Sequence, residues 1–303
     1  MREPRYRGRF APSPTGPLHF GSLVAALGSY LDARAAGGEW LVRVEDLDTP
    51  RSSRAEADDI LRTLEAFGFE WDGEVRFQGE RVTHYEDALA RLRAKGATYR
   101  CRCSRREIAD SALQGIDGPV YPGTCRVLAI PESTPASVRI RTDTEEIAFD
   151  DRLQGRIAQR LETDIGDFVL QRKDGLVAYQ LAVVVDDAEQ GITDIVRGAD
   201  LLLSTPRQIW LQRQLGLPLP RYLHLPVALN DAGQKLSKQT LAPALDRGHA
   251  LSELGRALAF LGQAPVEATT PAGLLAAAIA GWQPGQMPRR PATGMQGRGI
   301  RGV

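Results

Sequence analysis

The residues with the clearest chemical potential lie in two short loops that stand far apart in the chain. One loop ends in His19, Phe20 and Gly21, and the other contains Lys235 and Lys238. An imidazole and a small residue at the start of a helix give a phosphate a hydrogen-bond donor, space and a favourable dipole. Two ammonium groups in a loop suit the negative charge that gathers when a phosphoryl group is transferred. Together the two loops offer groups that suit phosphate chemistry.

Each of these residues also has an ordinary structural explanation. A histidine in this position is compatible with a plain helix cap, and lysines three residues apart are typical of a solvated surface. The order of the two loops, with the lysines after the last predicted strand, favours the chemical interpretation.

A second group of reactive side chains indicates a metal site. Cys101, Cys103 and Cys125 are the only cysteines of the chain, and Tyr121 stands four residues before the last one. An odd number of cysteines argues against a disulfide framework, whereas their grouping favours a metal. The alternative is three buried or free thiols. Because no histidine lies near them, a tetrahedral zinc site would need an oxygen ligand or water as its fourth partner.

Helices and strands at regular spacing must position these side chains. Residues 7–10 read as a strand, and a helix begins after His19, because Leu23, Leu27 and Leu31 share one face. Further predicted elements are a strand over 40–44, helices over 53–67, 80–95 and 205–215, and a strand over 223–229. This alternation predicts an α/β fold with a parallel sheet.

Two apolar runs are predicted as buried parallel strands that deliver polar groups to the ligand crevice. Residues 181–185 end in Asp186 and Asp187, and residues 192–196 end in Arg197. A buried arginine at a strand end needs a ligand or an acid opposite it. Asp186 and Asp187 are the candidates for a purely structural counter-charge.

The whole chain is large enough for one catalytic domain with an insertion. It has 303 residues, and its basic and acidic side chains are equal in number, so net charge neither requires nor excludes a nucleic-acid partner. We expect a catalytic domain over 1–98 and 166–242, an insertion over 99–165, a small helical region over 243–282 and a disordered tail over 283–303. With no signal peptide or membrane span in the sequence, we expect a cytoplasmic protein.

The segment from Arg9 to Ser22 resembles the first signature of class I aminoacyl-tRNA synthetases of the glutamate and glutamine branch, and residues 235–239 resemble their lysine loop. The resemblance covers about residues 7–244 and implies a Rossmann-like nucleotide-binding fold with a zinc-containing insertion. It also implies L-glutamate and ATP as substrates, with Mg²⁺ on the phosphates.

The resemblance assigns roles to individual residues. Glutamate would contact Arg9, Phe10, Ala11, Pro12, Ser13, Glu45, Tyr179 and Arg197. ATP would contact His19, Gly21, Ser22 and Lys238, with His19, Lys235 and Lys238 as catalytic residues. A structural zinc ion would be held by Cys101, Cys103, Tyr121 and Cys125. The chemistry agrees, because glutamate presents two carboxylates and one ammonium group, which need guanidinium donors and one acid.

The acceptor follows from the same resemblance. Only about sixty residues follow the lysine loop, where ordinary glutamyl-tRNA synthetases carry an anticodon-binding region. The truncated branch attaches glutamate to the queuosine base at the wobble position of tRNA(Asp), and its anticodon stem-loop would be the partner of a monomeric enzyme. Phe20, Ser22 and Gln239 favour this branch, although Gln239 continues as Thr-Leu-Ala. Alternatives are a minimal glutamyl-tRNA synthetase that charges tRNA(Glu) and a catalytically silent sensor.

Overall fold

The computed structural model describes residues 5–111, 113–229 and 243–289. Its first unit is a parallel sheet of β1 (Arg7–Phe10), β2 (Glu39–Val44) and β3 (Arg76–Phe77), in the order β1-β2-β3. Helix α1 (Phe20–Ala35) connects β1 to β2. The predicted strand, loop, helix and strand are therefore confirmed, with the signature loop between β1 and α1.

The second half of the chain adds two more parallel strands. β11 (Asp194–Gly198) pairs with β12 (Arg221–Leu225), and α7 (Thr205–Leu215) connects them. β11 runs beside β1, where the amide of Thr193 donates to the carbonyl of Arg7 at 3.0 Å. Because parallel strands end at a common edge, the residues that follow β1, β2, β11 and β12 face one crevice.

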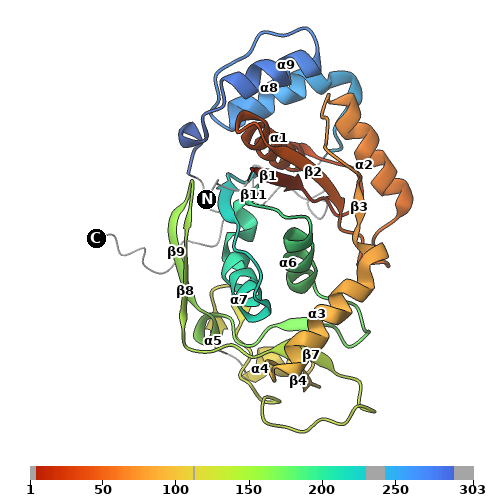
Figure 1. Ribbon diagram of the computed structural model, residues 1–303, viewed down its shortest axis with the longest axis vertical. Coiled ribbons are helices and arrows are strands. Elements are labelled where there is room, and N and C mark those ends of the chain that lie inside the picture. The colour runs from red at the N-terminus through yellow and green to blue at the C-terminus, as the bar shows by residue number, and fades with distance from the viewer. Residues whose placement is uncertain (1–4, 112, 230–242, 290–303) are drawn as a thin grey trace.

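Helices cover both faces of these strands, which confirms the α/β class (Figure 1). On one face lie α1, α2 (Arg54–Ala66), α8 (Ala250–Phe260) and α9 (Pro271–Ala280), and their apolar side chains share a core with Trp40 and Val42. On the other face lie α3 (Val82–Ala94), α6 (Tyr179–Glu189) and α7, which pack around Leu41 and Ile195. Successive side chains of β2 therefore pack into the cores on opposite faces of the sheet.

The prediction of a strand over residues 181–185 is wrong. These residues form the middle of helix α6, and every side chain from Leu181 to Asp187 is buried. A helix enclosed on all sides needs no polar face, so its sequence loses the periodicity that identifies a helix. The β-branched valines then suggested a strand, and tertiary packing overrode that local preference. Asp186 and Asp187 therefore lie in the last turn of a helix, not at a strand end.

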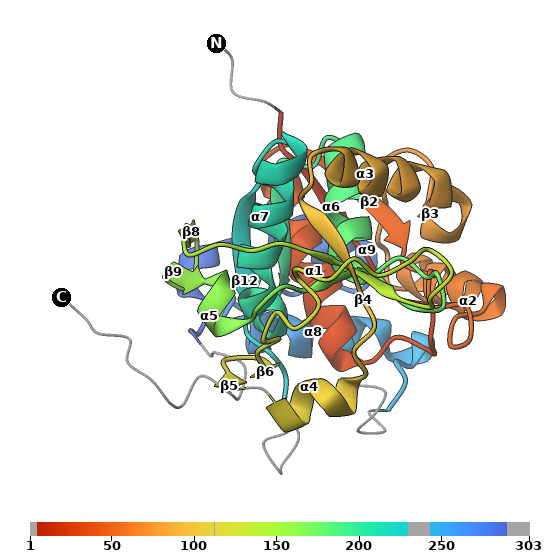
Figure 2. The same cartoon turned by 90° about the horizontal axis from the view of Figure 1, so that it is seen from below.

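The predicted insertion supplies β4 (Thr98–Cys101) and β7 (Ser137–Ile140) to a small antiparallel sheet. β10 (Val169–Gln171), which lies beyond the predicted end at residue 165, completes the order β10-β7-β4. α4 (Arg105–Ser111), β5 (Gln114–Gly115) and β6 (Gly118–Pro119) lie together at one edge of the molecule (Figure 2). The hairpin of β8 (Glu146–Asp151) and β9 (Gly155–Arg160), which α5 (Leu161–Asp164) follows, returns to the catalytic strands, because β8 pairs with β12.

The region after residue 243 packs on α1 through α8 and α9. The expectation of disorder from residue 283 onward is wrong for residues 283–289, since a 3₁₀ turn forms at Pro284–Gln286 and Met287 is buried in the core. Residues 290–303 lie outside the described part of the chain. Within the described part, no helix combines the length and the apolar character that crossing a bilayer requires.

Candidate functional site

A cavity of about 810 Å³ lies at the ends of β1, β2, β11 and β12. Its lining includes all described residues that the sequence predicted for glutamate or ATP: Arg9, Phe10, Ala11, Pro12, Ser13, His19, Gly21, Ser22, Glu45, Tyr179 and Arg197. The structure thus brings together residues spread over four elements and their loops. Lys235 and Lys238 lie outside the described residues, so their roles remain predictions.

His19 caps the N-terminus of α1 at the edge of the cavity. Its Nδ1 accepts a hydrogen bond from the amide of Ser22 at 3.3 Å, so the helix-cap interpretation is correct in part. The bond fixes the orientation of the ring and, in the neutral imidazole, leaves the proton on Nε2. The amides of the first turn and the helix dipole face the same cavity, which is the setting that an anion requires. Capping and phosphate binding are therefore compatible roles.

Asp187 joins two arginines beneath the cavity. Arg9 donates to both of its carboxylate oxygens, at 3.1 and 3.3 Å, and Arg43 donates to one of them at 2.8 Å. Burial raises the pKa of Asp187, but Arg9 and Arg43 outweigh it and lower the pKa below its ordinary value. The idea that Asp187 pairs with Arg197 is wrong, because Asp187 holds Arg9 and Arg43 instead.

Glu45 is the acid that faces the cavity from the end of β2. Arg43 donates to its Oε1 at 3.2 Å, while burial raises the pKa of Glu45 above its ordinary value. A desolvated carboxylate gains from an ammonium group placed against it. Tyr179, the first residue of α6, lines the same cavity, and burial raises the pKa of its hydroxyl. It therefore stays a neutral donor.

Arg197 is near the end of β11, and its guanidinium is buried. One guanidinium nitrogen has no hydrogen-bond partner among the described residues. Its Nε donates to Nε2 of His224 at 3.1 Å, and its Nη2 donates to the hydroxyl of Thr205 at 2.8 Å. Within the described residues, Nη1 has no hydrogen-bond partner and no carboxylate lies within ion-pair distance of the guanidinium. A buried cation in this state favours an anionic ligand.

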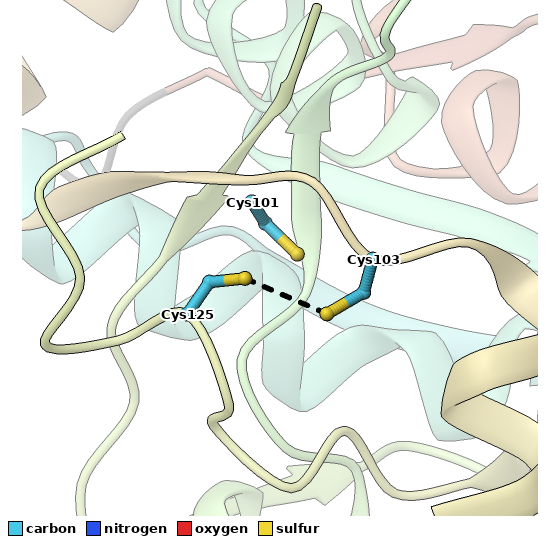
Figure 3. Close-up of side chains that lie close together, drawn as sticks. All are labelled: Cys101, Cys103 and Cys125. Carbon is cyan, nitrogen blue, oxygen red and sulfur yellow. Dashed lines mark hydrogen bonds between the residues drawn. The ribbon is translucent and has the colours of Figure 1, made fainter. Parts of the chain in front are cut away.

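The three cysteines come together as the sequence predicted. Cys101 and Cys103 come from the end of β4 and Cys125 from a facing loop, and their sulfurs point toward one centre (Figure 3). The sulfurs lie within 4.8 Å of one another, and those of Cys103 and Cys125 are 3.5 Å apart. Tetrahedral zinc thiolates, with bonds of about 2.3 Å, place sulfurs about 3.8 Å apart. The cluster can hold a metal ion.

Tyr121 supplies an oxygen to the same cluster. Its hydroxyl lies 3.3 Å from the sulfur of Cys101 and 3.8 Å from that of Cys103, and it accepts the amide of Cys125 at 2.9 Å. Gly166, with a φ of 76°, lets its segment pass the Tyr121 backbone, because a Cβ there would lie 2.6 Å from the Tyr121 carbonyl. Burial opposes ionisation of Cys101, but Tyr121 and Arg139 outweigh it and lower its pKa to about 7.

Three residues that support the cavity were not among the predicted site residues: Asp187, His224 and Asp151. Asp187 was left out because it was interpreted as a purely structural counter-charge for an arginine. A histidine inside the apolar strand 221–225 was a usable signal for His224, but its partner Asp151 lies 73 residues earlier in the chain. No sequence pattern linked the two.

Comparison with known proteins agrees with this fold. Residues 5–255 match the family model of class I tRNA synthetases (E and Q), catalytic domain. A glutamyl-Q tRNA(Asp) synthetase of Dechloromonas aromatica is 66% identical over 87% of this chain and 88% of that protein. One from Chromobacterium violaceum is 57% identical over 96% of this chain and 98% of that protein.

The likeness extends to solved structures. The crystal structure of a glutamate tRNA ligase from Elizabethkingia meningosepticum, in complex with its amino acid, superimposes with a TM-score of 0.79 and 24% identity. The superposition covers 95% of this chain and 67% of the ligase. At this identity the likeness is evidence for the fold and not for the function. The fold and the family model define a class I tRNA synthetase of the E and Q type. Within that class, the chain belongs to the ligase family of the glutamyl-Q tRNA(Asp) synthetases.

Proposed function

We propose that the chain activates L-glutamate with ATP and transfers it to the queuosine base of tRNA(Asp). The observation that carries the amino-acid assignment is the buried guanidinium of Arg197, whose Nη1 has no partner among the described residues. It lines the same cavity as an acid, Glu45, and a helix-capping histidine, His19. A dicarboxylate with one ammonium group and a neighbouring triphosphate match this set of charges.

The substrate pose follows from these charges. The side-chain carboxylate of glutamate lies against Arg197, and its ammonium group lies against Glu45. The hydroxyl of Tyr179 donates to a carboxylate, and Arg9 contributes to the pocket while Asp187 holds it in place. The backbone from Phe10 to Ser13 then faces the α-carboxylate.

The first step joins glutamate to the nucleotide. The α-carboxylate attacks the α-phosphorus of ATP, the bond to the β-phosphate breaks, and pyrophosphate leaves with Mg²⁺. His19, Gly21 and Ser22 at the N-terminus of α1 receive the phosphates, because amides and a helix dipole stabilise them. Lys235 and Lys238 are proposed to stabilise the charge on the leaving group.

The second step transfers the activated glutamate. A hydroxyl of the queuosine cyclopentene ring attacks the carbonyl of the glutamyl-adenylate, and AMP leaves. The names of the relatives support this acceptor, since the proteins of D. aromatica and C. violaceum are called glutamyl-Q tRNA(Asp) synthetases. A monomeric, cytoplasmic enzyme that receives the anticodon stem-loop remains part of the proposal.

Zinc is the proposed metal of the Cys101, Cys103, Tyr121 and Cys125 cluster. Three sulfurs and one oxygen suit zinc, and a site with four protein ligands is structural, without an open position for substrate. The ion would brace an insertion whose own apolar core is small.

Transfer of labelled glutamate to purified tRNAs tests the function. We expect incorporation into tRNA(Asp) that contains queuosine and none into tRNA(Asp) without it. Periodate treatment blocks a 3′-terminal diol and separates base attachment from ordinary charging. Incorporation into the 3′ end of tRNA(Glu) would instead support a minimal glutamyl-tRNA synthetase. Absence of glutamate-dependent ATP–pyrophosphate exchange would overturn the activation step.

A further inference from the structure

His224 and Asp151 form a buried pair behind the guanidinium of Arg197. His224 lies on β12, directly opposite Arg197 in the register with β11, and it is fully buried. Its Nδ1 lies 2.6 Å from Oδ2 of Asp151 on β8, and its Nε2 accepts the Nε of Arg197 at 3.1 Å. Three neighbouring strands therefore place a carboxylate, an imidazole and a guanidinium in one line.

The bonds to Asp151 decide which ring nitrogen of His224 carries the proton. Oδ1 of Asp151 accepts the amides of Leu153 and Gln154 at 3.0 and 2.8 Å, which favours the ionised carboxylate. An ionised carboxylate can only accept, so Nδ1 of His224 donates to it. Nε2 is left with a lone pair directed at Arg197, and the neutral ring is an acceptor there.

The environment keeps His224 neutral. Burial is the main cause that lowers its pKa, to about 4, although Asp151 opposes the shift and Arg197 adds to it. A protonated ring would lose the acceptor and place a second cation against Arg197. With a neutral partner, the guanidinium keeps its full positive charge for the cavity.

A purely structural explanation accounts poorly for this arrangement. Arg9 and Arg43 are both buried, and both contact the carboxylate of Asp187. Arg197 is equally buried, yet its acceptors among the described residues are an imidazole and the hydroxyl of Thr205, which are both neutral. Neutral acceptors fix the direction of a guanidinium without cancelling its charge.

We propose that Asp151, His224 and Thr205 are positioning residues that hold Arg197 with Nη1 directed at the distal carboxylate of the amino-acid substrate. The inference rests on the proposed function and deepens it, because it assigns the preference for glutamate over glutamine to a guanidinium fixed by neutral acceptors. Glutamine presents an amide in place of the carboxylate and gains less from that cation.

Two substitutions of His224 by amides of similar size distinguish a role in positioning Arg197 from a role in stabilising the fold. His224→Gln keeps an acceptor where Nε2 lies, whereas His224→Asn keeps an amide near Asp151 and leaves the Nε of Arg197 without an acceptor. The exposed His84 provides the control His84→Gln. Pyrophosphate exchange at varied glutamate, glutamine and ATP gives the kinetic constants, and thermal melting reports the fold.

We expect His224→Asn to raise the KM for glutamate roughly tenfold, the loss of about one hydrogen bond to a charged group, and to weaken discrimination against glutamine. The KM for ATP should stay unchanged, and His224→Gln should restore most of the loss. Thr205→Val removes the other acceptor with little change of shape, and it should also raise the KM for glutamate. Thr205→Val tests whether the neutral acceptors position Arg197 even if His224→Asn does not fold.

Several outcomes would overturn the inference. It fails if the KM for glutamate and the KM for ATP rise together with a fall in melting temperature in all three variants. It also fails if Arg197→Ala raises the KM for glutamate while His224→Asn and Thr205→Val leave it unchanged. If Arg197→Ala itself has no effect on that KM, the glutamate pocket of the proposed function is wrong, and the positioning role falls with it.

Discussion

Arg197 is buried, and no carboxylate of the described residues lies within ion-pair distance of its guanidinium, so a bound carboxylate would supply its counter-charge. Burial of an unmatched guanidinium lowers the stability of the free protein, whereas a bound carboxylate compensates it. This residue was predicted from its place after an apolar strand. Its partners were not, because Thr205, His224 and Asp151 come from three separate elements.

The first prediction concerns Arg197→Ala. Removal of a buried contact to a substrate carboxylate should raise the KM for glutamate by about 100-fold, and the free protein should be at least as stable as the unmodified one. Pyrophosphate exchange and thermal melting measure the two effects. Arg213→Ala, which removes a surface partner of Glu145, is the matched control. An unchanged KM for glutamate would contradict the assignment.

The second prediction uses the titration of His224. Its pKa is about 4 in the folded protein and about 6.5 in an unfolded chain, so between these values the unfolded state binds more protons. Stability from this group is present above pH 6.5 and is lost as the pH falls toward 4. The full loss is about 3 kcal/mol. The groups that face the ring are Asp151 on β8, Arg197 on β11, Thr205 on α7 and Asp200 after β11.

Urea unfolding at pH 7 and pH 5 measures this effect. The unmodified protein should lose more stability than His224→Gln over this interval, because the glutamine does not titrate. Glu45, whose raised pKa acts in the opposite direction, is present in both proteins and cancels from the difference. Equal losses in the two proteins would show that His224 does not resist protonation.

At the scale of elements, sequence patterns predict a helix well when one of its faces is exposed and poorly when the helix is buried on all sides. α7 begins and ends where it was predicted, at Thr205 and Leu215, because Pro206 suits the first turn of a helix and Gly216 ends the helix in a left-handed conformation. α6 was mistaken for a strand because it is enclosed on every side and has no polar face. Periodicity reports contact with water, so it disappears in the elements that lie deepest.

The third prediction tests α6 through Asp187→Asn. Loss of the negative charge leaves Arg9 and Arg43 buried against each other, with Glu45 and Asp186 as the remaining acids beside Arg43. We expect the free energy of unfolding to fall by about 3–5 kcal/mol, which is typical of breaking a buried ion pair. Asp174→Asn, which affects an exposed pair with Arg172, should change it by less than about 1 kcal/mol. Denaturant unfolding distinguishes the two.

At the scale of the whole molecule, separate hydrophobic cores stabilise different parts of the chain. The layers on the two faces of the catalytic strands hold most of the buried apolar side chains. Among the described residues, the small cluster around the cysteines has Tyr99, Cys101, Tyr121 and Cys125 as its buried members, with Cys103, Ile108 and Ile130 partly buried against them. The cysteine grouping was predicted because its members are near in sequence. The β8–β9 hairpin was assigned to the insertion, although it pairs with β12, because contacts between distant segments leave no local pattern.

The last prediction follows from this small third core. Cys103→Ser should release the metal ion, which elemental analysis of the purified protein measures, and the insertion should lose its brace because few apolar contacts replace it. Hydrogen exchange should then rise over residues 98–103 and 119–126, while α1 and α6 keep their protection because they belong to the other cores. Thr124→Ala, beside Cys125 but exposed, should retain the ion and the protection. Pyrophosphate exchange should persist in both variants, since the catalytic cavity contains none of the cysteines. An unmodified protein without metal would refute the zinc site and leave the glutamate pocket untouched.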